Sequence, residues 1–213
     1  KTVLNIALLN KFGYKISHID KMTPDEMKEK ILSLSQVQAQ QERIVNEMIH
    51  CMVDMKMDEF EAVLDNYILA KGIEKTITQI IFPFMERIGV LWQTNHINPA
   101  QEHLVTNIVR QKLIVGIEST NSHIKNDTSV LLFLPEGEHH ELGILFMSYL
   151  LKSRGISTLY VGANIPIKDV EYVANIKKPD LLYTHLTSVA YNFNFEKFLI
   201  NFQNRMPDFK LVV

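Results

Sequence analysis

The spacing of apolar residues changes near residue 125, and this change constrains the fold more than any other feature of the sequence. From about residue 35 to 124, apolar residues recur three or four positions apart, which is typical of helices that bury one face. From Thr128 onward, short continuous apolar runs alternate with helical stretches. Continuous runs of this kind are typical of strands buried on both faces of a parallel sheet. The sequence therefore predicts a helical part followed by an α/β part.

The helical part is predicted to contain four helices, because signals for helix ends and starts divide it. Gly72 follows one apolar stripe and is typical of a helix end. Asn98 and Pro99 suit the N-cap and the first helical position of the last helix, and Gln101 completes a capping box. Four helices with short connections favour a compact bundle over residues 35–125.

The α/β part is predicted to alternate strands with helices. Strands are expected at residues 129–134, 158–161, 180–186 and 210–213, and helices at about 141–153, 167–176 and 195–205. Alternation of this kind requires right-handed crossovers and builds a parallel sheet. We therefore expect residues 126–213 to form a Rossmann-like (flavodoxin-like) domain that is C-terminally incomplete, because the pattern stops partway. The expected fold class is α + α/β, with a four-helix bundle followed by this parallel-sheet domain.

Composition and charge argue against several classes of protein. Hydrophobic residues make up 46% of the chain and charged residues 22%, which argues against intrinsic disorder. The 22 basic and 24 acidic residues leave a net charge of −2, so the chain as a whole is not a basic nucleic-acid-binding body. Cys51 is the only cysteine, which excludes an internal disulfide or a thiolate zinc site and fits a reducing cytoplasm. No apolar run approaches the ~20 residues that cross a bilayer, so we expect no membrane partner.

The loop over residues 135–143 is the first place where a ligand is expected, because ligands of open α/β sheets bind beyond the carboxyl ends of the strands. It holds two histidines, three glutamates and two glycines, and a solvated charged turn is the alternative explanation. A zinc peptidase motif is excluded, because residue 144, four positions after His140, is isoleucine. A phosphate-binding loop is excluded, because no Gly-Lys-Ser/Thr follows. What remains is the spacing Glu138-x-His140-x-x-Gly143.

This spacing resembles the D-x-H-x-x-G motif of cobalamin-binding corrinoid domains. The resemblance implies that His140 is the lower cobalt ligand and that Glu138 orients it from the other ring nitrogen, as outer-shell carboxylates orient metal-binding histidines. It implies that Gly143 allows the displaced nucleotide tail of the cofactor to approach the main chain. Glutamate in place of aspartate departs from the motif, but it recurs in the light-sensing members of the family.

A second set of residues lies in the helical part, where Trp92 precedes Glu102 and His103. Taken singly, Trp92 is explained by core packing, and His103 by a surface histidine near a helix terminus. Taken together as W-x9-E-H, directly before the loop motif, these residues resemble the CarH/LitR photoreceptor regulators of the MerR superfamily. The resemblance covers nearly the whole chain.

The resemblance to these regulators implies adenosylcobalamin as the cofactor, with the helical bundle covering its upper face. It implies that Trp92 packs against the adenosyl group and that Glu102 forms a hydrogen bond with it. It further implies that His103 becomes the upper cobalt ligand after photolysis, while His140 stays the lower one. A neutral imidazole is a suitable nitrogen ligand for this role, and the photochemistry itself belongs to the cofactor.

The start of the chain fits the same family. Residues 7–19 resemble the last helices of a MerR-type winged-helix DNA-binding domain, so residues 1–22 are interpreted as a remnant of that domain. The recognition helix would lie upstream of this segment. The capping box at residues 23–26 then starts a linker helix, assigned to residues 23–34, that leads to the bundle.

Three further positions carry weaker signals. Gly162 and Pro166 follow the second expected strand and match a G-x-x-x-P turn near the cofactor in this family, although such turns are common in any α/β sheet. Ser188 follows the third strand, where the family has a small polar residue near the nucleotide tail. His96 and His185 lie near these regions, and the sequence assigns them no role.

The expected function is that of the light-sensing and oligomerisation part of a transcriptional repressor, without enzyme activity. In this interpretation adenosylcobalamin joins the bundle to the sheet in the dark, and a homo-oligomer, by resemblance a tetramer, holds operator DNA through the missing N-terminal domain. Photolysis of the cofactor then drives disassembly and release of the DNA.

Two alternatives remain open. A corrinoid-carrier module of a methyltransferase or mutase would share the loop motif but has no reason to begin with a winged-helix remnant. A regulator that has lost cobalamin, or that binds haem or another tetrapyrrole, would keep the fold. Absorbance spectra with added cobalamins distinguish this second alternative, and activity with a methyl donor distinguishes the first.

Overall fold

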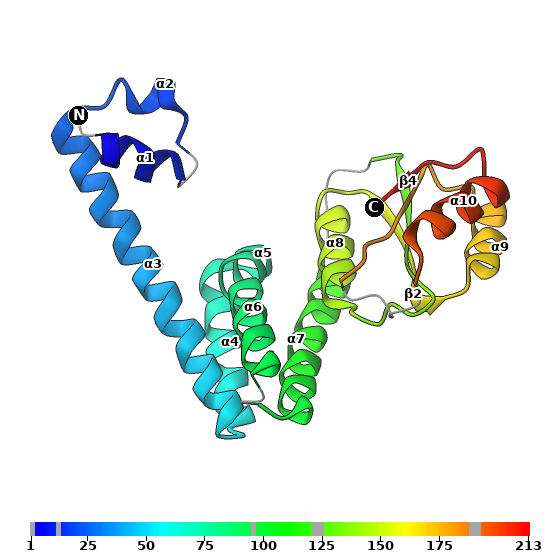
Figure 1. Cartoon of the computed structure of the whole chain (residues 1–213), viewed down its shortest axis with the longest axis horizontal. Coiled ribbons are helices and arrows are strands. Elements are labelled where there is room, and N and C mark those ends of the chain that lie inside the picture. Colours follow the sequence, from blue (N-terminus) through cyan, green and yellow to red (C-terminus); the bar gives the residue numbers. More distant parts are fainter. Residues whose placement is uncertain (1–2, 12–13, 95–96, 121–125, 188–192) are drawn as a thin grey trace. The chain divides into compact units, whose positions relative to one another are not determined.

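The computed structural model consists of a helical region followed by a parallel sheet flanked by helices, as expected (Figure 1). It describes residues 3–11, 14–94, 97–120, 126–187 and 193–213. The chain divides into two compact units, here called the helical unit (residues 1–67 and 75–98) and the sheet unit (residues 68–74 and 99–213).

The helical unit is built from helices of very different lengths. They are α1 (Val3–Lys11), α2 (Ile16–Ile19), α3 (Pro24–Val53), α4 (Met57–Lys71), α5 (Ile73–Thr76), the π-helix η1 (Ile77–Ile81) and α6 (Phe82–Gln93). The ends of α4 and α5 that lie nearest Gly72 belong to the sheet unit. Gly72 ends α4 with a φ of +80°, in the left-handed region that favours glycine, as the sequence predicts. The longest helix, α3, has 30 residues, but neither it nor any other described helix is long and apolar enough to cross a membrane.

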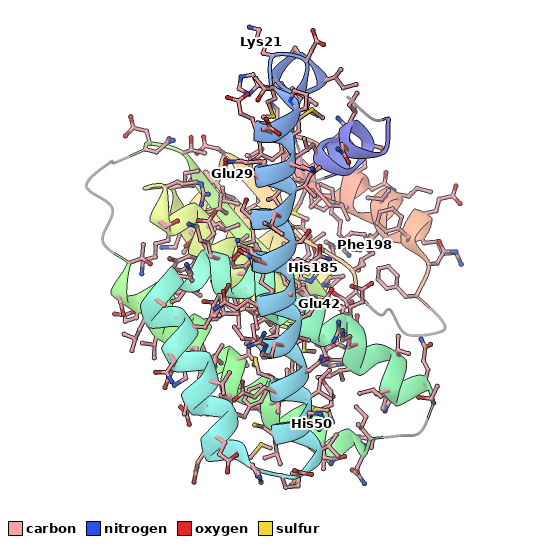
Figure 2. The ribbon with its side chains drawn as sticks, turned by 90° about the vertical axis from the view of Figure 1, so that its left-hand side faces the viewer. Lys21, Glu29, Glu42, His50, His185 and Phe198 are labelled. Atoms are coloured by element: carbon pink, nitrogen blue, oxygen red, sulfur yellow. The ribbon has the colours of Figure 1, made fainter. Side chains whose placement is uncertain are left out.

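The start of α3 is set by a capping box. The Thr23 hydroxyl accepts a hydrogen bond from the Glu26 N–H (3.2 Å), and the Glu26 carboxylate accepts one from the Thr23 N–H (2.6 Å). The predicted helix start is therefore confirmed. The helix then runs to Val53 without a break, so the expected boundary between a linker helix (23–34) and the bundle is not a structural break. Figure 2 shows this single helix, with Glu29, Glu42 and His50 labelled along it.

The core of the helical unit is formed by the apolar positions that the sequence places three or four residues apart. The Phe60 ring of α4 packs against the Phe84 ring of α6, with ring centroids 5.4 Å apart. Other buried core side chains are Val45, Met48, Met52, Leu64, Ile77, Ile80, Ile81 and Ile88. A separate small cluster of Leu9, Ile19 and Met27 joins α1 and α2 to the first turns of α3.

A π-turn lies just before Pro83, in a stretch where the sequence predicts an ordinary helix. Proline lacks an N–H, and within a helix its ring clashes with the carbonyl four residues earlier. In η1 the Phe82 N–H donates to the Ile77 carbonyl, one residue further back than in an α-helix. The wider turn accommodates Pro83 without ending the helix.

After residues 68–74, the sheet unit contains α7 (Pro99–Ser119) and then alternating strands and helices. These are β1 (Ser129–Pro135), α8 (Leu142–Ser153), β2 (Ser157–Ile165), α9 (Ile167–Lys177), β3 (Leu181–Tyr183), α10 (Phe195–Arg205) and β4 (Leu211–Val212). The strand order is β2-β1-β3-β4, and all pairs are parallel. The predicted parallel sheet is confirmed, although β2 is longer and β3 shorter than expected.

The central strand β1 is buried on both faces. Leu131 and Phe133 pack with residues of α9 and α10 on one face, whereas Val130, Leu132 and Leu134 pack with α8 on the other. Figure 1 shows α8 on one side of the sheet and α9 and α10 on the other. This two-sided burial explains why the sequence of β1 is a continuous apolar run.

Helix α7 belongs to the sheet unit, which differs from the expected boundary at residue 125. The physical reason is its close packing along α8. A Cβ at Gly116 would lie 3.5 Å from the Tyr149 ring of α8 and 2.2 Å from Ile73 Cδ1, so an alanine there would require the Ile73 side chain to shift. An ion pair between Arg110 of α7 and Glu141, 2.9 Å long, adds a polar contact.

Two leucines in register on β1 and β2 test the account of the core. Leu131 has no exposed surface, whereas its neighbour Leu159 is 36% exposed. We expect Leu131→Ala to lower the free energy of unfolding by about 2–5 kcal/mol, because it removes buried methyl groups and leaves a cavity. Leu159→Ala should cost less than half as much. Urea denaturation measures both, and equal losses would contradict the assignment of Leu131 to the core.

Candidate functional site

The loop between β1 and α8 lies at the carboxyl end of the sheet and is tied to the end of β2. Gly137 has a φ of +89°, and its N–H donates to the Asn164 side chain (2.8 Å). The Asn164 N–H in turn donates to the Glu138 carbonyl (3.0 Å). These hydrogen bonds fix the main chain of the loop around Glu138.

The Glu138 carboxylate is fully buried and accepts hydrogen bonds from two parts of the chain. Its Oε1 accepts the main-chain N–H groups of His139 and His140, both at 2.9 Å. Its Oε2 accepts the N–H of Thr187, after β3, at 2.7 Å. A buried carboxylate is costly unless donors satisfy it, so these contacts explain how the charge is kept inside. They also join the loop after β1 to the segment after β3.

The structure places the His140 ring against the same carboxylate. His140 Nδ1 lies 2.6 Å from Glu138 Oε1, and the His140 side chain is 56% exposed. Because Oε1 already accepts two N–H groups, we assign the ring proton to Nδ1, which leaves a lone pair on Nε2. An imidazole held in this way is a preorganised nitrogen ligand for a transition metal.

Gly143, in the first turn of α8, meets the ring of His185. A Cβ at Gly143 would lie 2.8 Å from His185 Nε2 and 3.0 Å from Cε1, so a larger residue would force the ring to move. His185 follows β3 and is labelled in Figure 2. Its Nδ1 is buried and has no hydrogen-bond partner among the described residues. Gly143 is thus a close-approach residue, and the group that approaches it here is His185.

The pKa of His185 is lowered from its ordinary value. Desolvation by burial is the main cause, because it disfavours the charged ring. The Glu138 carboxylate raises this pKa, the His140 ring lowers it, and a hydrogen bond to the His140 main chain raises it. The neutral ring therefore lies beside the Glu138–His140 pair.

Glu102 and His103 form a second glutamate–histidine pair, in the first turns of α7. His103 Nδ1 lies 3.3 Å from Glu102 Oε2, and the His103 side chain is 72% exposed. The other oxygen, Glu102 Oε1, accepts a hydrogen bond from the Thr106 hydroxyl (2.9 Å). In both pairs a carboxylate lies at Nδ1, which leaves Nε2 for another partner.

The position of His103 on α7 relates it to the loop. His103 and Arg110 are seven residues apart, so they lie on the same face of the helix, about 10 Å apart along its axis. Arg110 contacts Glu141, the residue directly after His140. The exposed His103 ring therefore projects from the α7 face that meets the loop two turns further on.

Two other residues of interest, Trp92 and Gly162, lie elsewhere in the structure. Trp92 lies near the end of α6 in the helical unit and is 58% exposed, so core packing does not explain it. Gly162 lies at a β-bulge, where the register with β1 moves from Tyr160 to Gly162, and its φ of +123° requires glycine for the main chain alone. Ser188 and His96 lie outside the described residues.

The sequence analysis missed the polar contacts around Glu141. Arg110 Nε donates to Glu141 Oε2 (2.9 Å), and the Tyr160 hydroxyl donates to Oε1 (2.5 Å). Burial, followed by the hydrogen bond to Glu141, raises the pKa of Tyr160 above its ordinary value. A glutamate next to the motif histidine and a tyrosine within an apolar strand were the available signals. These contacts join α7, the loop and β2.

The donor set fits a metal that a macrocycle already holds. Among the described residues, no group of three or more His, Cys, Asp or Glu side chains could hold a metal ion. The loop instead offers one oriented imidazole, His140. One imidazole suffices where a corrin ring supplies the equatorial nitrogen ligands, as in cobalamin. The close approach at Gly143 and the unpartnered His185 Nδ1 lie beside this imidazole.

A family model and two curated proteins are similar to parts of this chain. Residues 44–115, which run from α3 into α7, match the family described as "B12 binding domain". The chain is 26% identical over 145 residues to the HTH-type transcriptional repressor CarH of Myxococcus xanthus, covering 68% of this chain and 48% of that protein. The HTH-type transcriptional repressor CarA of the same organism is 27% identical over 125 residues, covering 59% and 41%.

Residues 44–115 are thus similar to a B12 binding domain, and the chain is similar to the repressors CarH and CarA. It spans about half the length of the curated relatives it matches. The fold has a solved counterpart in the monomethylamine corrinoid protein of Methanosarcina barkeri. That structure superposes with a TM-score of 0.64 and 15% identity, covering 80% of this chain and 82% of the other. This likeness shows a shared fold over most of both chains.

Glu138→Gln tests the account of the buried carboxylate. The amide nitrogen is a donor and would face one of the N–H groups that now donate to the carboxylate. We expect the free energy of unfolding to fall by about 1–3 kcal/mol, the typical cost of an unsatisfied buried polar group. Glu136→Gln, on the exposed neighbour in the same loop, is the matched control and should change little. Equal effects in urea denaturation would contradict the role of Glu138.

Tyr160→Phe tests the contacts around Glu141 through their pH dependence. The pKa of Tyr160 is raised in the folded protein, whereas the pKa of this side chain in the unfolded chain is about 10. Its contribution to stability is therefore complete below about pH 10 and is lost as the pH rises further. We expect the unfolding free energy of the wild type to fall more steeply above about pH 10 than that of Tyr160→Phe. Tyr172→Phe, at an exposed tyrosine, should keep the wild-type slope, and a wild-type slope in Tyr160→Phe would refute this assignment.

Proposed function

We propose that this chain is the cobalamin-binding, light-sensing and oligomerisation part of a transcriptional repressor, with adenosylcobalamin as its cofactor. The similarity to the repressors CarH and CarA supports the class of protein. The observation that carries the proposal is the geometry of His140, whose Nδ1 contacts the buried Glu138 carboxylate while much of its side chain is exposed. This geometry prepares Nε2 for a metal that already carries its equatorial ligands.

Three residues of the loop region act on the lower side of the cofactor in this proposal. His140 would hold the cobalt through Nε2. Glu138 accepts a hydrogen bond from the Nδ1–H group, which keeps the ring from rotating and increases the electron density on Nε2. Gly143 has no side chain, so the lower part of the cofactor can approach the main chain of α8.

Three other residues act on the upper side. Adenosylcobalamin, when bound, supplies a cobalt–carbon bond that light can break. Trp92 is an exposed aromatic side chain that shields the adenosyl group, and Glu102 accepts a hydrogen bond from it. The exposed His103 would supply a ring nitrogen as the upper cobalt ligand after photolysis. Gly162 and Ser188 remain proposed contacts of the cofactor.

The proposed switch acts through α7. Because α7 carries His103 and also the Arg110 contact to Glu141, any movement of its first turns is opposed by the contacts around Glu141. A ligand shifts a protein between two arrangements only if it binds them with different affinity. We propose that the dark arrangement forms a homo-oligomer, by resemblance a tetramer, and that the light arrangement dissociates. We propose that operator DNA is held through a MerR-type domain of which residues 1–22 are a remnant, because these residues resemble the end of such a domain and the chain as a whole is not basic, with a net charge of −2.

Size-exclusion chromatography tests the proposed switch. Adenosylcobalamin added in darkness is expected to shift the protein to a larger species, and green light is expected to reverse the shift. His103→Ala should assemble in darkness as the wild type does. After illumination, its absorbance spectrum should differ from that of the illuminated wild type, because the upper imidazole is missing. An elution volume that is the same without cofactor, in darkness and after light would contradict light-controlled assembly.

Absorbance spectra test the lower ligand. With His140→Ala, the spectrum of bound cobalamin should lose the features of imidazole coordination, because no other side chain in the loop carries an oriented Nε2. His139→Ala removes the exposed neighbouring imidazole and should leave the spectrum unchanged. If the two variants exchange these results, His139 rather than His140 is the ligand.

A corrinoid carrier for a methyltransferase or mutase is the second candidate function. It would use the same loop, and the fold likeness to a corrinoid protein does not separate the two functions because the identity is only 15%. The sequence similarity to repressors favours the regulator. We expect no methyl transfer to or from the bound cofactor with common methyl donors, since the proposed function has no catalytic step of its own.

A further inference from the structure

The His185 ring occupies the space beside Gly143, at the edge of the sheet where His140 lies. An ideal Cβ on Gly143 would come within 2.8 Å of His185 Nε2, so the ring lies directly against the main chain of α8. The loop before α8 and the segment after β3 are joined there through Glu138. The space beside Gly143 is therefore a defined slot, and His185 fills it.

Placing the His185 ring in this slot costs free energy, because polar atoms are buried there without partners in the described part of the chain. His185 Nδ1 is buried without a hydrogen-bond partner among the described residues, and the same holds for the hydroxyl of the adjacent Thr184. An unsatisfied buried polar atom typically destabilises a protein. A side chain whose only task was to fill space would be apolar, because leucine has a similar volume and no polar atom. The unpartnered nitrogen therefore indicates that the ring is held in the slot less firmly than an apolar side chain would be.

The hydrogen bonding of His185 allows it to leave. The ring interacts with the main chain of His140 and has no ion pair with a neighbouring side chain at its unpartnered nitrogen. Nδ1 gains water as a partner when the ring swings out. The free energy needed to move His185 is therefore small compared with that of a fully satisfied buried group.

The chemistry of cobalamin indicates what would replace the ring. When an imidazole such as His140 binds cobalt from below, the cofactor's own base must leave the metal on that side. Gly143 follows His140 by three residues and is the point at which a group can lie against the main chain. The displaced base is a flat nitrogen heterocycle, and the imidazole of His185 has this same shape and chemistry.

We propose that His185 is a displaceable plug that determines which corrinoid tails the slot beside Gly143 accepts. A tail that ends in a base must displace His185, so the ring weakens the binding of complete cobalamins. A corrinoid without the nucleotide base, such as cobinamide, leaves His185 in place. This inference rests on the proposed cobalamin binding and adds a residue that determines specificity for the tail.

Equilibrium titrations with two corrinoids test the plug. Absorbance changes give dissociation constants for hydroxocobalamin and for cobinamide with the wild type and with His185→Ala. We expect His185→Ala to bind hydroxocobalamin about tenfold more tightly, because the slot is open in advance. Its affinity for cobinamide should stay unchanged. His139→Ala, which removes an exposed imidazole from the neighbouring loop, is the matched control and should change neither constant.

Two further variants separate the plug from a general effect on folding. His185→Leu keeps the slot filled, so it should not show the gain of His185→Ala for hydroxocobalamin. Gly143→Ala places a methyl group in the slot, so it should weaken the binding of hydroxocobalamin and spare cobinamide. Urea denaturation of each variant without ligand identifies any that do not fold, and the remaining variants still decide the outcome.

The outcomes distinguish the plug from the function on which it rests. If the wild type binds neither corrinoid, the proposed cobalamin binding is wrong. If it binds both, and removal of the His185 ring leaves the ratio of the two constants unchanged or weakens the binding of hydroxocobalamin, the plug is wrong. If His185→Ala tightens the binding of both corrinoids equally, His185 does not discriminate between tails, and the proposal is also overturned.

Discussion

The candidate site depends on one buried carboxylate. Glu138 has no exposed surface, and its oxygens accept main-chain hydrogen bonds from the loop after β1 and from Thr187 after β3. Removing a carboxylate from water costs more free energy than one hydrogen bond returns, so the charge stays buried only because several donors converge on it. The His140 ring is one of these donors. Its orientation is thus a consequence of satisfying Glu138, which prepares Nε2 before any ligand arrives.

The same arrangement of a carboxylate at Nδ1 recurs on α7, where Glu102 lies beside His103. The two pairs belong to one unit, because α7 packs on α8 through Gly116 and contacts Glu141 through Arg110. In the proposed function, these two pairs would supply one imidazole for each side of the corrin ring.

Much of the fold is predictable from the sequence, because it depends on local patterns. The apolar spacing predicts the helices and strands, and the capping box predicts the start of α3. The π-turn before Pro83 and the assignment of α7 to the sheet unit depend on packing, which spacing does not encode. The loop composition indicates Glu138 and His140, but the meeting of Gly143 with His185 depends on β1 and β3 being neighbours in the sheet. Sequence reasoning had no means to find that contact.

Electron paramagnetic resonance of the protein with bound cob(II)alamin tests most directly whether a histidine nitrogen held by Glu138 binds cobalt. The nuclear spin of the axial nitrogen splits the signal, so the isotope of that nitrogen determines the splitting pattern. With protein labelled with nitrogen-15 histidine, the account predicts that the triplet of ordinary nitrogen becomes a doublet, and that His140→Ala restores the triplet or removes the splitting. A triplet that persists in the labelled wild-type protein would mean that the cofactor keeps its own base, and it would contradict the account.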